Sequence, residues 1–213
     1  RGKMVRMHTI VLYPILTTLI ALAPEAIPLI FGPAWEPAVF PTQVLAVAGM
    51  ASAAVAGSAQ LAFAVGKPKA VFYFLLAALL VYVGVLLLAS GYGLRAVVIS
   101  VAVYQVIFVA AQFNYLESRQ AGIPRHEIWA AIVPALGASV ISLAATYPVA
   151  RALDDAGLGS VLVILLAGIL ALAVYAVALR VLYRAAWDEA LDLARELIGR
   201  KRRKAVDVPV TGE

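Results

Sequence analysis

The segment from Ala70 to Ser90 reads AVFYFLLAALLVYVGVLLLAS and contains no charged residue in its 21 positions. A helix needs roughly 20 apolar residues to cross the hydrocarbon core of a bilayer. An unpaired charge near the middle of the membrane costs roughly 2.5–3.5 kcal/mol on insertion scales. Length and composition together therefore predict that this segment is a transmembrane helix.

Five other segments repeat this pattern, and charged residues fall almost entirely between them. The sequence therefore predicts an all-α, polytopic bundle of about six transmembrane helices over residues 1–183. A cleaved signal peptide is an alternative for the first segment, with Ala21-Leu22-Ala23 as a cleavage site. Pro24 directly after that site argues against cleavage. The five further segments are His8–Leu29, Thr42–Val65, Leu94–Leu116, Ile128–Val149 and Gly159–Val181.

Overall composition points to the same class of protein. Hydrophobic residues make up 64% of the chain and charged residues 14%, whereas soluble domains are about 45–50% apolar and about 25% charged. A water-soluble fold of 213 residues cannot hide so much apolar surface, because its surface-to-volume ratio limits burial. The lack of cysteine excludes disulfides and thiolate metal sites. Because the chain starts at Arg1 rather than Met, we interpret it as a fragment or a processed chain.

The distribution of Lys and Arg orients the predicted bundle. With an even number of spans, both ends of the chain lie on one side. Every Lys and Arg except Arg95 and Arg151 then falls on that side. Since cytoplasmic loops carry an excess of Lys and Arg, we expect both termini to be cytoplasmic.

The C-terminal tail has a different pattern from the spans. Apolar residues recur at helical spacing from Tyr183 to Ile198, which predicts a cytoplasmic amphipathic helix over residues 184–199. Residues 200–213 are expected to be a basic, disordered tail. Its basic cluster is expected to attract anionic lipid, at about 1 kcal/mol per charge, and acts as a topology anchor or as a site for a specific partner. The cluster consists of Arg200, Lys201, Arg202, Arg203 and Lys204.

Motifs of enzyme chemistry are missing from the sequence. There is no Gly-rich phosphate loop, no His-Glu-x-x-His and no Gly-x-Ser-x-Gly. His8 and His126 lie at the ends of different predicted spans, and Asp154-Asp155 is typical of a turn. We therefore expect no catalytic residue, no metal, no cofactor and no nucleic-acid partner.

Polar residues within the fourth predicted span are the first candidates for a cavity. Five side chains fall within roughly a 100° arc of a helix, and amides in a membrane helix should face protein or water rather than lipid. Interhelical packing and a cavity lining both fit this pattern. These residues are Tyr104, Gln105, Phe108, Gln112 and Tyr115.

Two further candidates lie in the first two spans. Glu25 stands between Pro24 and Pro28, and is either a solvated acid at the external interface or an ion-coupling residue. Gln60, near the end of the second span, either faces a cavity or is solvated at the interface. In the same span, small residues repeat every four positions, which predicts close helix packing. They are Gly49, Ala53 and Gly57.

A group of turn and packing motifs resembles a known transporter family. Phe31-Gly32-x-x-Trp35 ends the first span, Val44-Leu45-Ala46 opens the next, and Gly66-Lys67-Pro68 follows it. The combination resembles the polysaccharide and lipopolysaccharide exporters of the multidrug/oligosaccharidyl-lipid/polysaccharide flippase superfamily. Gly91–Arg95 is similar to a glycine-containing turn of that family.

The resemblance implies a function and partners. It covers the C-terminal half of such a protein, so an N-terminal lobe of the same protein is an expected partner. It implies flipping of a polyprenyl-diphosphate-linked oligosaccharide across the bacterial inner membrane by alternating access. Membrane lipid, a polysaccharide polymerase or glycosyltransferases are the other implied partners. The family's cationic cavity residues have no counterpart within the spans of this chain.

Three alternative functions stay open at this point. A drug or metabolite antiporter of the same superfamily requires an acid deep within a span, and none is evident from the sequence. A membrane enzyme of glycan assembly requires clustered acids or histidines at one interface. A scaffold without transport activity requires the basic tail.

Overall fold

The computed structural model describes residues 2–184, 187 and 188, and the predicted all-α bundle with six membrane-spanning helices is confirmed there. No strand occurs among these residues. The predicted segments 184–199 and 200–213 lie outside the described residues apart from Arg184, Trp187 and Asp188. The elements in chain order are α1 (Gly2–Phe31), the 3-10 helix η1 (Pro33–Ala38), α2 (Val39–Ala54), α3 (Ser58–Ala64), α4 (Pro68–Ser90), α5 (Leu94–Gln112), the π-helix η2 (Phe113–Gln120), α6 (Arg125–Asp155) and α7 (Ser160–Leu182).

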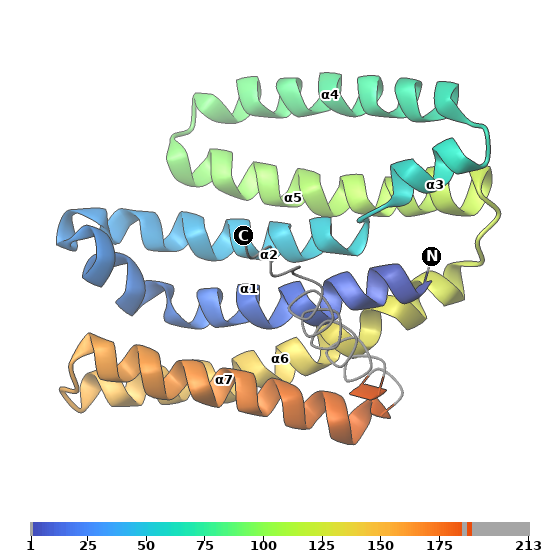
Figure 1. Ribbon diagram of the computed structural model, residues 1–213. Helices are drawn as coiled ribbons and strands as arrows, with labels where there is room; N and C mark the ends of the chain where they lie inside the picture. Colours follow the sequence, from blue (N-terminus) through green and yellow to red (C-terminus); the bar gives the residue numbers. More distant parts are fainter. Residues whose placement is uncertain (1, 185–186, 189–213) are drawn as a thin grey trace, which may run out of the picture.

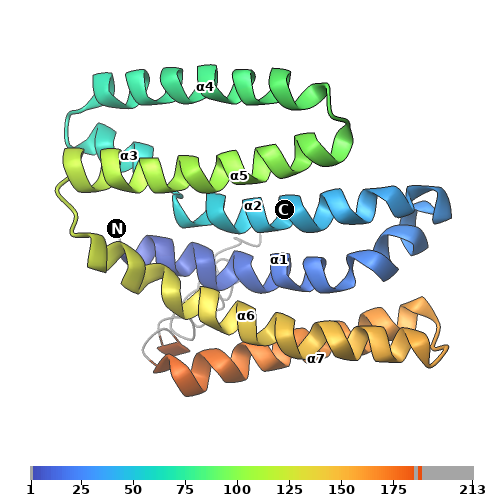
Figure 2. The ribbon, with the colours of Figure 1, turned by 180° about the vertical axis from the view of Figure 1, so that it is seen from behind.

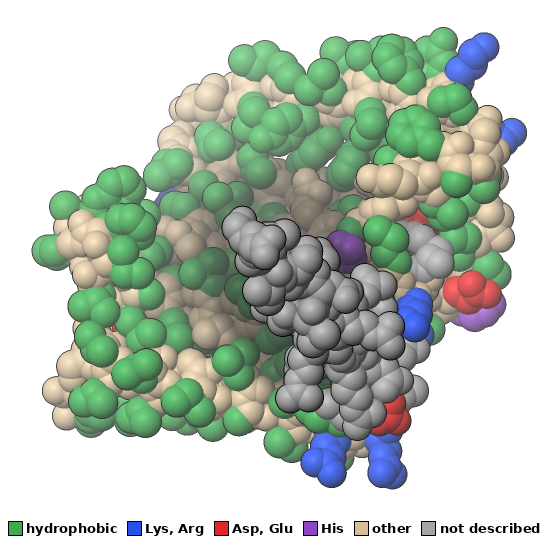
Figure 3. Space-filling view, in the orientation of Figure 1, with side chains coloured by type: hydrophobic (Ala, Val, Ile, Leu, Met, Phe, Trp, Pro, Cys, Tyr) green, Lys and Arg blue, Asp and Glu red, His purple; other side chains and the backbone are tan. Residues whose placement is uncertain are grey.

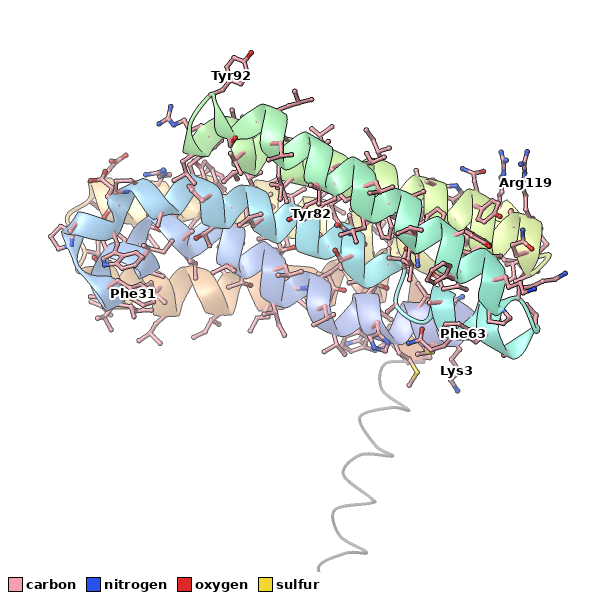
Figure 4. All side chains as sticks on the ribbon, turned by 90° about the horizontal axis from the view of Figure 1, so that it is seen from above. Lys3, Phe31, Phe63, Tyr82, Tyr92 and Arg119 are labelled. Carbon is pink, nitrogen blue, oxygen red and sulfur yellow. The ribbon has the colours of Figure 1, made fainter. Side chains whose placement is uncertain are left out.

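The spans run side by side and alternate in direction (Figures 1 and 2). Helix α1 occupies the centre, where it contacts α2, α6 and α7, while α5 lies between α2 and α4. Figure 4 places Lys3, Phe63 and Arg119 at one end of the bundle and Phe31 and Tyr92 at the other. The first of these ends is called the Lys3 end below, and the second the Tyr92 end.

Helix α4, which contains the segment quoted first, is the most exposed span. Only 6% of its most apolar part is buried, and its mean hydropathy is 2.8. Hydrophobic side chains cover most of the face shown in Figure 3, while the visible charged side chains gather mainly at one end. Exposed apolar surface of this extent is stable against lipid tails or other membrane helices, and not in water.

Small side chains let the central helices approach closely. Ala131, Ala135 and Ala138 of α6 are buried in one cluster with Ala178 of α7. A Cβ atom added at Gly168 of α7 would lie 3.5 Å from the Leu22 side chain of α1. Lipid tails are as apolar as the helices, so association depends on such close van der Waals contact.

The second predicted span, Thr42–Val65, is not one continuous helix, which corrects the sequence-based expectation. It divides into α2 and α3, with Gly57 between them at φ +85°. That left-handed conformation suits glycine, which lacks a Cβ. Gly49 does belong to a packing surface, since a Cβ there would lie 3.4 Å from Leu16 of α1. Gly57 instead interrupts the span, so the predicted stripe of small residues ends at Ala53.

The fourth span is longer than predicted. It continues past Leu116 as the π-helix η2 to Gln120. The hydropathy of the sequence falls at Glu117, where a span is expected to end, but packing against α3 and α4 keeps this part of the chain helical.

Candidate functional site

A polar pocket of about 410 Å³ lies at the Tyr92 end of the bundle. It forms where the end of α1 meets η1. The first turns of α2 and α5 and the junction of α6 with α7 complete it. Such a collection of charged and amide side chains is unusual in a membrane bundle, because polar groups there are expensive and usually functional. Its polar lining residues are Glu25, Glu36, Gln43, Arg95, Arg151, Asp154 and Ser160.

Proline chemistry in α1 shapes one wall of the pocket. Pro24 has no N–H, so it cannot donate the usual helix hydrogen bond to the carbonyl of Ile20. The side-chain amide of Gln43 supplies that bond instead, with Nε2 donating to the Ile20 oxygen at 2.8 Å. This contact joins α2 to α1 and uses one N–H of the Gln43 amide. Pro28 similarly leaves the carbonyl of Pro24 without its helix donor, and both prolines line the pocket.

The two arginines of the pocket are held by aromatic rings. The guanidinium carbon of Arg95 lies 5.6 Å from the centre of the Phe40 ring. That of Arg151 lies 5.5 Å from the centre of the Tyr147 ring, and its Nη2 donates to the Tyr147 hydroxyl at 3.4 Å. Cation–π contact positions a guanidinium group without neutralising its charge. The pocket therefore places two positive groups beside the carboxyl groups of Glu25, Glu36 and Asp154.

Glu25 is buried in this pocket, in contrast to a solvated interfacial acid. Its exposed fraction is 5%, whereas Glu36, Arg95, Arg151 and Asp154 are exposed. Its Oε2 atom is buried and has no hydrogen-bond partner. Glu25 is thus the buried charge of the pocket, with one carboxyl oxygen available.

A second, apolar hollow of about 530 Å³ runs between α4 and α5. Val81 and Val85 of α4 and Ile99, Val103 and Ile107 of α5 line it. Its dimensions and composition suit a hydrocarbon chain. Arg95 of the polar pocket precedes Ile99 by one helical turn, and residues at i and i+4 are neighbours on a helix surface. One helical turn of α5 therefore separates a lining residue of the polar pocket from a lining residue of the apolar hollow.

The five candidate residues of the fourth span separate into two groups. The first group packs on α4: Tyr104 donates its hydroxyl hydrogen to the carbonyl of Ala78 at 2.8 Å, and Phe108 lies 5.5 Å from Phe74, measured between ring centres. Tyr115 stacks on the same Phe74 ring at 5.7 Å. Tyr104 and Phe108 also line the apolar hollow, so packing and lining occur together.

The two candidate amides of the fourth span, Gln105 and Gln112, form the second group. Gln112 is 6% exposed, on the same face as buried Val98 and Val109, and its Oε1 has no hydrogen-bond partner. Gln105, which is half-buried, lies seven residues earlier on that face. Gln60 is exposed on α3. Their assignment as cavity residues stays a prediction.

Glu117 is a buried acid that the sequence did not reveal. It is 1% exposed in η2, and the hydroxyl of Ser58 in α3 donates to its Oε1. The break at Gly57 places Ser58 where it can make this contact. The predicted span ended one residue before Glu117, so the acid was assigned to a loop. A helical pattern continued by one turn beyond the apolar segment is the signal that could have located it.

Among the described residues, no three His, Asp or Glu side chains lie close enough together to hold a metal ion. His8 bonds to the carbonyl of Met4 within its own helix at 3.1 Å, while Asp154 lies at the end of α6 in the pocket. The basic cluster 200–204 lies outside the described residues.

Comparisons with family models, curated proteins and solved structures find no match to this chain. The bundle has a polar pocket with two arginines and, one helical turn further along α5, the beginning of an apolar hollow.

Proposed function

We propose that this chain forms part of a transporter that flips a lipid-linked oligosaccharide across a bacterial inner membrane by alternating access. One observation carries the proposal: the arginine-containing pocket and the apolar hollow have lining residues one helical turn apart on α5, Arg95 and Ile99. A ligand with an anionic head and a long hydrocarbon tail needs both environments next to each other. A polyprenyl-diphosphate-linked glycan has that chemistry, and the motif resemblance of Phe31–Pro68 supports the same substrate class.

The features of the bundle support a protein that changes shape. Three prolines lie within α1, and the second span is interrupted at Val55–Gly57. Interrupted helices are typical of transporters, where they line the substrate path. In this proposal both chain ends are cytoplasmic, which places the polar pocket at the external surface. A second lobe of the protein would cover the exposed face of the bundle.

Substitution of the two arginines tests the proposal. Arg95→Gln together with Arg151→Gln should lower flipping of a polyprenyl-diphosphate oligosaccharide by about tenfold or more, because a hydrogen bond to a charged group contributes about 1.5–3 kcal/mol. Arg180→Gln is the matched control. Arg180 is exposed near the C-terminus of α7, at the Lys3 end of the bundle and away from the pocket. The full reading frame is expressed in a deletion strain, and lipid-linked glycan on each leaflet is measured.

Two results would overturn the proposal. One is flipping by the double variant at the rate of the Arg180→Gln control. The other is normal surface glycan in a clean deletion strain that has no redundant exporter.

A drug or metabolite antiporter is the second candidate. The buried acids Glu25 and Glu117 favour it, because such an antiporter needs an acid within a span. In that case, the deletion strain should become sensitive to exported compounds while its surface glycan stays normal.

A further inference from the structure

Glu25 has a buried carboxyl oxygen, Oε2, with no hydrogen-bond partner, although donors line the same pocket. The amide nitrogen of Gln43 donates to the Ile20 carbonyl. Arg151 donates to the Tyr147 hydroxyl and lies over that ring. Neither of these hydrogen bonds goes to Glu25. A buried carboxylate in this state is unfavourable unless a cation compensates it.

The geometry favours the smallest cation. Among the described residues, no group of three acidic or histidine side chains could hold a metal ion, so multivalent chelation is not supported. A proton needs only one oxygen. The pocket volume of about 410 Å³ far exceeds the ~10–15 Å³ that one water requires, so water can carry protons between Glu25 and bulk solvent.

We propose that Glu25 is the site at which a proton binds and dissociates during transport. This inference deepens the proposed function and rests on it. The carboxyl group of Glu25 takes a proton from a hydronium ion in the pocket, which leaves a water and a neutral carboxylic acid; dissociation reverses the step. No other bond changes.

Proton binding also changes how the pocket receives an anion. With Glu25 ionised, the pocket holds three carboxylates and two guanidinium groups, whereas protonation removes one negative charge. Arg151 attracts an ionised Glu25 and Asp154 repels it. An anionic head group is therefore repelled less when Glu25 is protonated, and by linkage the bound anion favours protonation. The charged residues around Glu25 are Glu36 of η1, Arg95 of α5, and Arg151 and Asp154 of α6.

Carbodiimide labelling of the purified full-length protein tests the proton site without a transport assay. Dicyclohexylcarbodiimide reacts with protonated carboxyl groups in apolar surroundings, and mass spectrometry locates the adduct. We expect an adduct on Glu25 whose yield falls as pH rises, since the ratio of acid to carboxylate drops about tenfold per pH unit. Glu25→Gln should remove the adduct, while the exposed control Glu127→Gln should leave it unchanged.

Three outcomes would overturn the proton site. The first is the absence of an adduct on Glu25 at any pH in the folded protein. The second is an adduct yield that does not depend on pH. The third is protection of Glu25 by Na⁺ at constant pH, which would identify a sodium site instead. Because labelling needs no glycan, these outcomes leave the proposed flipping function standing. Conversely, a pH-dependent adduct in a protein that does not flip glycan would refute only the proposed function.

Coupling is tested in cells. Wild-type flipping should change with external pH, and Glu25→Gln should abolish that dependence while the protein still reaches the membrane. A Glu25→Gln variant that keeps the wild-type pH dependence would refute coupling through this residue.

Discussion

Removal of the Ser58 hydroxyl should destabilise the contact between α3 and η2. Ser58 is 0% exposed and Glu117 is 1% exposed, so their contact lies away from bulk solvent. The loss of one buried hydrogen bond costs about 1–3 kcal/mol. For a chain of this size each kcal/mol lowers the melting temperature by about 2–4 °C. Ser58→Ala should therefore lower the melting temperature by about 2–12 °C.

The measurement is the thermal transition of tryptophan fluorescence in a mild detergent. Ser90→Ala is the matched control, because Ser90 is exposed and donates only to the Leu87 carbonyl of its own helix at 2.8 Å. Its effect should stay within about 0.5 kcal/mol. If both substitutions shift the transition equally, the contact between Ser58 and Glu117 does not stabilise the fold and the reasoning fails.

A double-mutant cycle separates this contact from the loss of the hydroxyl itself. In a Glu117→Gln background, Ser58→Ala should cost less than in the wild type, because the charge-assisted hydrogen bond is already absent. Equal costs in both backgrounds would show that the two side chains act independently.

Three further predictions use exposed or helical positions as controls. Gly57→Ala should destabilise the protein by about 1–2 kcal/mol, because its left-handed backbone disfavours a Cβ. Gly84→Ala is the control inside α4, with open space around it, and should be neutral or stabilising. The same melting experiment compares the two variants. Tyr104→Phe should cost about 1 kcal/mol through loss of the hydrogen bond from α5 to α4, whereas Tyr92→Phe, at 83% exposure, should have no effect on the melt. Because the chain has no cysteine, Tyr92→Cys and Lys67→Cys report topology: an impermeant maleimide added to intact cells should label position 92 only, and the reverse pattern would refute the proposed orientation.

The class and the number of spans could be predicted from the sequence because membrane insertion is largely a local, additive property. The 21 residues from Ala70 to Ser90 satisfy the length and polarity requirements without reference to any other part of the chain. All six spans lie where hydropathy placed them, with helix ends that differ by several residues, and the second is interrupted by a break. The break at Gly57 was missed because a glycine among alanines is also typical of close helix packing.

The candidate site was only partly predictable. Glu25 was recognised as an embedded acid between two prolines, but its burial depends on Gln43 and on α6. Tyr104, Phe108 and Tyr115 were recognised as one helix face, but the sequence did not show that this face packs on Phe74 and Ala78 of α4. A single helix period shows which residues share a face and does not show which helix covers that face.

The sequence by itself determined that this is a six-span membrane protein with its Lys and Arg residues concentrated at one end, since hydropathy and charge act residue by residue. Tertiary structure alone decided that Ser58 meets Glu117, 59 residues away, and that Arg95 and Arg151 share a pocket with Glu25. Those contacts depend on which helices become neighbours. Their choice follows from shape complementarity among small side chains, and lipid exerts no hydrophobic force that would reveal it in the sequence.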